Sequence, residues 1–284
     1  MYPCKAEGSR RSIILFLALA YGASWLVEVP AALTTYGLLH VHIPRGLLNA
    51  AQFAPALAAL TTTVLLFGSR SLRPLVAPLV KVRAPLIWYA LVLFVPPVTQ
   101  FGALLLYGAL GHPMPAISPW TQLPLMILVL ALFSVGEELG WRGFFLPALR
   151  RNNSPLAVAA WMALSWGLWH LPFYLRSNSE GQSTWLLYLL FLAGMPPVCA
   201  FFVLLFSRTQ SLLLCMLFHG SLNGSAAYFF GPLATGELLP FALWILLLWI
   251  LGIPFFIILS RESRCDAPAP RFAVTSPEPE SASI

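Results

Sequence analysis

Residues 122–147 read QLPLMILVLALFSVGEELGWRGFFLP. From Leu125 to Phe133 the stretch is apolar on every side, which excludes the alternating polarity of a membrane β-strand. An α-helix satisfies its own backbone hydrogen bonds in lipid, and this run is long enough to cross about 30 Å of hydrocarbon. The stretch therefore predicts a transmembrane helix with two acids and one arginine in its second half.

The rest of the 284-residue chain has the same character. Apolar residues make up 59% of it and charged residues 9%, against about 25% charged in ordinary soluble proteins, and the mean hydropathy is +0.80. Apolar runs near spanning length recur at 12–36, 47–68, 86–110, 122–147, 156–175, 185–206, 210–230 and 240–260. We therefore predict an all-α, polytopic bundle of about eight transmembrane helices in the cell membrane, formed by residues 1–262.

The first apolar run has the outline of a signal peptide. Lys5, Arg10 and Arg11 precede it, and residues 18–20 resemble a cleavage site. The apolar stretch before that site is short, however, and the run continues through Trp25. We predict a retained helix.

Basic residues gather in alternate loops of this eight-helix scheme. If the N-terminus is cytoplasmic, the outer loops contain only Arg45 and Arg176, and the other fourteen lysines and arginines lie on the cytoplasmic side. The positive-inside rule then predicts that both termini are cytoplasmic. The net charge of +6 indicates attraction to anionic membrane lipids and no nucleic-acid partner.

Two segments lie outside the predicted bundle. Residues 69–85 form a basic loop, punctuated by prolines, that we expect along the inner membrane surface. Residues 263–284 are rich in Pro, Ser, Ala and Glu, which predicts a disordered tail.

Ionisable residues inside the predicted spans are few, and because they are costly in lipid each suggests a function. They are Glu28, Glu137, Glu138, Arg142, His170 and His219. Glu138 and Arg142 are four residues apart and can form an ion pair, whereas Glu137 lies about 100° around the helix and is left as a candidate general base. The alternative is that both acids are structural. Glu28 stands apart and receives no role.

The first histidine, His170, lies one helical turn after Trp166 and shortly before Pro172. The proline is expected to loosen the backbone hydrogen bonds around it. The alternative to a functional role is a histidine that hydrogen-bonds a neighbouring carbonyl.

The second histidine, His219, shares a helix face with Asn223. Gly220 and Gly224 lie on the adjacent stripe, where their spacing lets another helix approach closely. The alternative is a packing seam in which the polar pair joins helices.

These groups lie on three predicted helices and can meet only inside the bundle, because lipid would reject them. At about 1.5 Å per residue, Glu137 and His219 lie roughly 14–15 Å from the cytoplasmic ends of their helices, and His170 about 5–8 Å deeper.

The sequence resembles the CPBP family in three motifs, which are Glu137-Glu138-x-x-x-Arg142, Trp166-x-x-x-His170 and His219-x-x-x-Asn223. This family contains the type II CAAX prenyl proteases and bacterial relatives linked to bacteriocin processing or self-immunity. The resemblance covers residues 120–230, the motif core of the predicted domain, and the eight-helix count agrees with it. It implies a hydrolase, an intramembrane endopeptidase that cleaves a membrane-associated or lipidated peptide or protein.

The resemblance also implies a role for each motif residue. Glu137 would be the general base, and His170 would help it hold the attacking water. His219 and Asn223 would hydrogen-bond the developing oxyanion, for which an imidazole N–H and an amide are suitable donors. The residues that would shape the site are Glu138, Arg142 and Trp166.

Trp166 departs from the family, which more often has phenylalanine at this position. We expect the ring to serve as an aromatic wall that does no proton chemistry, and activity to tolerate the change.

A metal site is an open alternative. Glu137, His170 and His219 could bind zinc with water in an open position, and the family is often described as metalloproteases. The familiar His-Glu-x-x-His helix is absent from the sequence, however. We favour a metal-free enzyme without a cofactor.

Two other functions stay open. Intramembrane Glu and His residues also serve as relay groups in proton- or ion-coupled transporters, although the sequence shows no pair of broken helices in two inverted halves. A non-catalytic bacteriocin-immunity scaffold would keep the fold for binding alone, although the intact motif set argues against it. The sequence identifies neither the substrate nor the oligomeric state.

Overall fold

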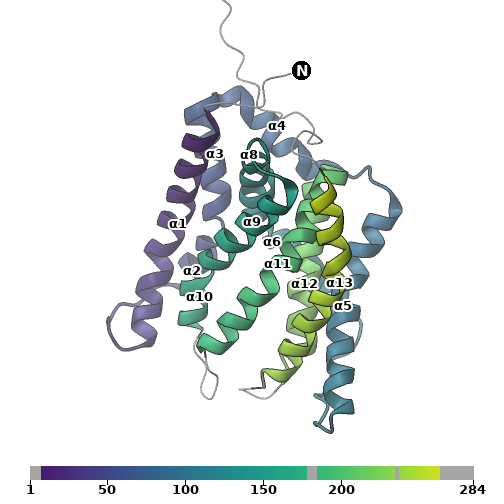
Figure 1. Cartoon of the computed structure of the whole chain (residues 1–284). Coiled ribbons are helices and arrows are strands. Elements are labelled where there is room, and N and C mark those ends of the chain that lie inside the picture. The colour runs from purple at the N-terminus through teal and green to yellow at the C-terminus, as the bar shows by residue number, and fades with distance from the viewer. Residues whose placement is uncertain (1–7, 178–183, 234–236, 263–284) are drawn as a thin grey trace, which may run out of the picture.

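The computed structural model describes residues 8–177, 184–233 and 237–262, and the predicted tail at 263–284 lies outside them. Within these ranges the chain is an all-helical bundle without strands (Figure 1). The long helices are α1 (Gly8–Thr35), α3 (Ala54–Phe67), α5 (Leu86–Ala109), α6 (Gln122–Phe133), α9 (Pro155–Trp169), α11 (Thr184–Thr209), α12 (Leu212–Phe230) and α13 (Leu239–Arg261). Short segments connect or continue them, namely α2 (Arg45–Ala51), η1 (Ser69–Ser71), α4 (Leu72–Val76), η2 (Ala77–Val80), α7 (Val135–Glu138), η3 (Leu139–Phe145), α8 (Leu146–Arg150) and α10 (Leu171–Arg176).

The predicted membrane bundle is confirmed. In the part of the chain that the structure describes, 7 helical segments are long and apolar enough to cross a membrane, and the bent pair α2–α3 brings the count to 8. Each predicted apolar run corresponds to one of these segments. The protein is therefore a multi-pass integral membrane protein.

The second span differs from the single helix expected over 47–68. It is two helices, α2 and α3, that meet at an angle of 52°. Pro55 lies in the first turn of α3, and a proline ring clashes with the carbonyl of the residue four positions earlier. That residue is Ala51, where α2 ends.

The basic segment after α3 is also more ordered than the loop expected over 69–85. Residues 69–80 form three short helical segments, η1, α4 and η2, and α4 lies at the end of the bundle where the chain begins (Figure 1). Leu75 and Pro78 are buried in this segment, so it is anchored to the bundle by apolar contacts.

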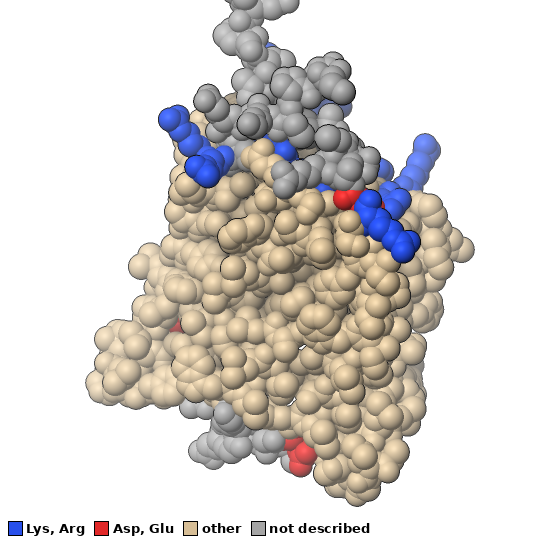
Figure 2. All heavy atoms as spheres, in the orientation of Figure 1, with Lys and Arg blue, Asp and Glu red and all other residues tan. Residues whose placement is uncertain are grey.

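Positive charge is concentrated at one end of the molecule. Figure 2 shows lysine and arginine atoms at the end where α1 begins and α13 finishes, above a wall of uncharged residues. This separation is the basis for the predicted orientation, in which that end faces the cytoplasm. The orientation itself stays a prediction.

The seam expected at Gly220 and Gly224 lies inside the bundle, between α12 and α6. A Cβ atom at Gly220 would lie 2.4 Å from the backbone N of Ala131, and one at Gly224 would lie 2.8 Å from the backbone N of Ile127. Only glycine therefore lets these two helices approach so closely, and the approach brings the His219 helix next to the helix that leads into the acidic motif.

Replacing Gly220 by alanine should destabilise the protein by about 1–3 kcal/mol, because the added methyl group meets backbone atoms that cannot rotate away. Thermal unfolding in detergent measures this loss. Gly22→Ala in α1 is the matched control, since a Cβ there has no heavy atom within 4 Å. Equal unfolding temperatures for the two variants would contradict the packing argument.

Candidate active site

The acidic motif lies where the span Gln122–Arg150 leaves regular α-helical geometry. α7 ends at Glu138, and η3 continues the chain as a π-helix, a form with wider hydrogen-bonded turns that is frequent at functional sites. Every residue from 136 to 146 is buried. The motif therefore lies in the protein interior, with Glu137 8% exposed.

Two glycines bring the bend of the second span against this motif. A Cβ at Gly140 would lie 2.5 Å from the carbonyl carbon of Pro55, and one at Gly136 would lie 2.9 Å from the carbonyl oxygen of Gln52. The α2–α3 bend therefore packs backbone to backbone against the stretch that holds both acids.

Glu138 is the centre of a buried charged cluster. Its Oε1 accepts hydrogen bonds from Arg142 Nη1 at 2.9 Å and from His219 Nδ1 at 2.7 Å. The Glu138 and Arg142 side chains have no exposed surface. The predicted Glu138–Arg142 pair is present, but the contact with His219, 81 residues away, has no local sequence signal.

The Arg142 guanidinium is held between two aromatic rings. Its Cζ lies 3.9 Å from the centroid of the Trp166 ring and 3.6 Å from that of Phe202. Cations over aromatic faces are stabilised, most strongly where they are desolvated. The two rings therefore stabilise the buried positive charge of Arg142 in addition to the Glu138 carboxylate.

Glu137 points away from this cluster and toward α9. Its Oε2 accepts a hydrogen bond of 2.7 Å from Trp166 Nε1 and lies 3.9 Å from His170 Nε2. Trp166 therefore does more than form the expected aromatic wall, because its indole also donates a hydrogen bond to the candidate base. Phenylalanine, which has the ring alone, could not make this contact.

His170 lies at a break in its span. α9 ends at Trp169 and α10 begins at Leu171, and the His170 backbone N–H donates to the carbonyl of Gly167 at 3.2 Å. The Trp166 carbonyl instead accepts from His170 Nδ1 at 2.8 Å. Because a carbonyl can only accept, Nδ1 carries the proton, and the Nε2 of the neutral ring keeps its lone pair on the side of Glu137.

The two polar residues predicted to act together on α12, His219 and Asn223, have different surroundings in the structure. His219 is buried and turned toward Glu138, whereas the Asn223 side chain one turn later is exposed. Among the residues that the structure describes, no hydrogen bond joins Asn223 to the other candidate site residues. Its pairing with His219 on a common oxyanion stays a prediction.

The donor set fits zinc poorly. Within residues 8–177, 184–233 and 237–262, no three His, Cys, Asp or Glu side chains are arranged to hold a metal ion. His219 directs Nδ1 to Glu138, and Glu137 accepts from an indole N–H, so of the three proposed ligands only Glu137 and His170 face each other, at 3.9 Å.

Residues on α1 form hydrogen bonds with the segments on either side of the α9–α10 break. The sequence alone assigns these residues no role. Tyr21 Oη donates to the Ser165 carbonyl, and Trp25 Nε1 donates to the Trp169 carbonyl at 3.2 Å. Farther along, Glu28 accepts a 2.7 Å hydrogen bond from Arg176 Nε. These α1 contacts lie on both sides of His170.

Glu28 and Arg176 lie 148 residues apart. The only sequence signal for their ion pair was an unexplained acid inside a span.

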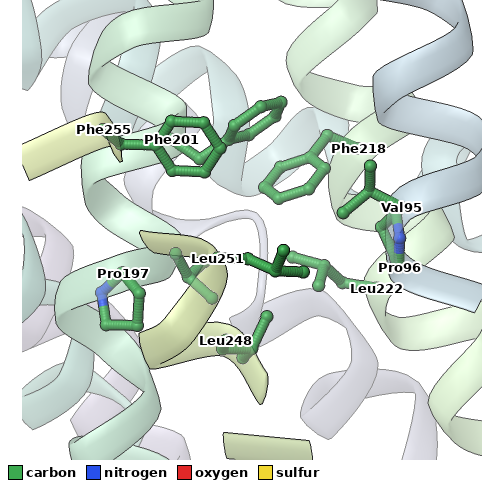
Figure 3. A pocket seen from close by; sticks show the side chains of 10 residues that line it. Val95, Pro96, Pro197, Phe201, Phe218, Leu222, Leu248, Leu251 and Phe255 are labelled. Atoms are coloured by element: carbon green, nitrogen blue, oxygen red, sulfur yellow. The ribbon is translucent and has the colours of Figure 1, made fainter. Parts of the chain in front are cut away.

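A separate pocket lies between α5, α11, α12 and α13 (Figure 3). Its wall is entirely apolar and includes Phe201, Phe218, Leu222 and Leu251. Because its lining has no titratable side chain, this pocket offers no group for acid–base chemistry.

The region that holds these residues has known relatives. Residues 119–225 match the model of a protein family described as type II CAAX prenyl endopeptidase Rce1-like. The chain is also 29% identical over 103 residues to CAAX prenyl protease 2 of Methanococcus maripaludis, a match that covers 34% of this chain and 38% of that protein. The chain thus spans less than half the length of this relative. The family expected from the three motifs is confirmed for this region.

Proposed function

We propose, on the premise that residues 119–225 form an Rce1-like region, that the protein is an intramembrane endopeptidase. Its substrate would be a peptide bond of a membrane-associated or lipidated peptide or protein. The observation that carries the proposal is the pair formed by Glu137 Oε2 and His170 Nε2, which lie 3.9 Å apart and are both turned away from the Glu138 cluster.

Two proton acceptors at this separation can share one water molecule. The water would donate one hydrogen bond to the Glu137 carboxylate and one to His170 Nε2, which is unprotonated while Nδ1 donates to the Trp166 carbonyl. Glu137 then removes a proton from the water as its oxygen attacks the carbonyl carbon of the scissile bond. His170 orients the water during this step.

The tetrahedral intermediate carries a negative oxygen that needs donors. In its doubly protonated form, which it keeps throughout the reaction, His219 donates from both ring nitrogens, from Nδ1 to Glu138 and from Nε2 to this oxygen. The Asn223 amide, one turn along α12, is the second proposed donor. Glu138 and Arg142 hold His219 in this orientation without touching the substrate.

The reaction ends when the carbon–nitrogen bond breaks. Glu137, now protonated, transfers its proton to the leaving nitrogen, so the products are a carboxylic acid and an amine and the enzyme regains its starting form. All proton transfers involve Glu137, which is why its position governs the rate.

The direct test uses the purified full chain in lipid vesicles with two synthetic peptides, one that has a farnesylated CAAX end and one with the same sequence and no lipid. We expect mass spectrometry to detect a cleaved product. Proton or ion flux without cleavage would instead favour a transporter. That reading has little support, because one bent helix pair occurs in the described part of the chain and an inverted repeat needs two.

Metal removal should leave the activity unchanged. Because no three His, Cys, Asp or Glu side chains in the described part of the chain are arranged to hold a metal ion, we expect cleavage to survive dialysis against a strong chelator. The same peptide assay, run before and after dialysis and again with added zinc, measures this. Loss of cleavage that only zinc restores would overturn the metal-free proposal.

A further inference from the structure

We propose that Tyr21 and Trp25 on α1 are positioning residues that fix His170 against Glu137, because they anchor the end of the helix that leads to the histidine. This inference rests on the proposed protease function and adds two residues to its machinery. Both lie outside residues 119–225, the region that matches the family model. α1 runs beside α9 and α10 at one edge of the bundle (Figure 1).

The last turn of α9 departs from regular helical hydrogen bonding. The His170 N–H donates to the Gly167 carbonyl at 3.2 Å, three residues back, whereas an α-helical N–H reaches four residues back. Two residues later, Pro172 has no N–H to donate. Carbonyls at a helix end need partners from outside the helix, so the position of this turn depends on the side chains that reach it.

Two of those side chains come from α1. The Tyr21 hydroxyl donates to the Ser165 carbonyl, and Trp25 Nε1 donates to the Trp169 carbonyl at 3.2 Å. The two donors are four residues apart on α1 and the two acceptors are four residues apart on α9, so one turn of each helix faces one turn of the other. Two bonds in register fix both the height and the rotation of the turn, which a single bond could not do.

Two more carbonyls of the same turn accept from side chains. The Gly167 carbonyl accepts from Tyr188 Oη of α11 at 3.2 Å, and the Trp166 carbonyl accepts from His170 Nδ1 at 2.8 Å. The imidazole is thus tied to main chain that α1 and α11 hold in place. Any displacement of the turn would move the ring with it and change the 3.9 Å separation between His170 Nε2 and Glu137 Oε2.

The same helix also contacts the stretch that follows the two acids. Phe16 of α1 has no exposed surface. Its ring stacks on Phe144 and Phe145 of η3, with centroids 5.3 and 5.4 Å away, and meets Trp141 edge-on at 5.4 Å. α1 therefore packs against both the continuation of the acidic helix and the end of α9. Because a misplacement of about 1 Å can cost about 100-fold in rate, this common support affects catalysis although it touches no reacting atom.

The decisive variant combines Tyr21→Phe with Trp25→Phe, which removes both donors and keeps an aromatic ring at each position. We expect kcat for peptide cleavage to fall about 10-fold. KM should stay close to the wild-type value, because the change displaces His170 and no group that binds the peptide. Steady-state cleavage of the vesicle-bound peptides measures both constants. Each single variant should show a smaller loss of the same kind, and the single variants replace the double one if it fails to fold.

Tyr228→Phe combined with Trp249→Phe is the matched control. The Tyr228 hydroxyl donates to the Ser118 carbonyl, and Trp249 Nε1 donates to the Ala193 carbonyl at 2.8 Å. The control deletes the same two kinds of hydrogen bond, but neither bond reaches the end of α9, so kcat should stay near the wild-type value. A loss of kcat equal to that of the α1 variant would indicate a general effect of weakened packing and would overturn the inference.

The loss of activity should also depend on His170. If α1 acts through the imidazole, the α1 variant should lose no further activity in a His170→Ala background, whereas independent effects on the two sites would multiply. The same fold-loss in both backgrounds would overturn the inference.

Amide hydrogen exchange tests the same contacts without activity. In the α1 variant, peptides from residues 165–175 should exchange faster than in the wild type, because local opening of the anchored turn becomes easier, and the control variant should leave this segment unchanged. Wild-type exchange rates in the α1 variant would overturn the anchoring. Wild-type protein that cleaves no peptide, with faster exchange in the α1 variant, would refute the protease function and retain the anchoring of α9.

Discussion

Glu137→Gln should reduce peptide cleavage by about 10²–10⁴-fold, the usual contribution of a general acid–base group. The amide has nearly the same shape, and its oxygen can still accept from Trp166 Nε1, so packing around the site is preserved. It cannot take a proton from water. Cleavage of the two vesicle-bound peptides by wild type and variant, with thermal unfolding as a check on folding, measures the effect.

Glu28→Gln is a suitable control, because Glu28 is a buried carboxyl group in another span. A glutamine there keeps an oxygen for Arg176 Nε, and we expect cleavage to be retained. Full activity in Glu137→Gln would contradict the catalytic role of Glu137. Rescue of a cellular phenotype by Glu137→Ala would instead support a scaffold that binds without catalysis.

Arg142→Met should have the largest effect on stability, a loss of about 3–5 kcal/mol, because it leaves a buried carboxylate without its cation. Glu138 has no exposed surface and would keep only His219 as a partner. The methionine fills much of the space between the Trp166 and Phe202 rings, so little of the loss would come from a cavity. Thermal unfolding in detergent, monitored by intrinsic fluorescence, measures the change in stability.

The matched control for this variant is Arg208→Met. Arg208 Nη2 pairs with Glu262 Oε1 at 2.6 Å, yet the arginine side chain is 52% exposed, and exposed pairs contribute about 0–1 kcal/mol. The two variants delete the same group from ion pairs that differ mainly in burial. Similar losses in both would contradict the view that desolvation makes the Glu138 cluster critical.

Local patterns predicted a large part of the molecule. The apolar runs identified every span, since lipid demands long apolar helices regardless of how they pack. The Glu138–Arg142 pair was predictable because four residues nearly complete a helical turn. Even the bend of the second span has a local cause in Pro55, although the apolar run by itself predicts one continuous helix.

Distances between spans were less predictable. Counting residues from helix ends put His170 about 5–8 Å deeper than Glu137, whereas the side chains lie 3.9 Å apart. The count treats every helix as upright, but α9 crosses the bundle obliquely (Figure 1) and stops at Trp169. Tilt and helix ends depend on neighbouring helices, and no single run contains that information.

By itself, the sequence determined that the chain is a membrane helix bundle and which few polar side chains are available for chemistry, because the cost of polarity in lipid acts on each residue separately. Only the tertiary structure decided how those groups are paired: His219 with Glu138, the Trp166 indole with Glu137, and Glu28 with Arg176. Each of these pairs joins residues from different helices. The pairs therefore depend on how closely the helix backbones approach one another, as they do where Gly220 meets Ala131.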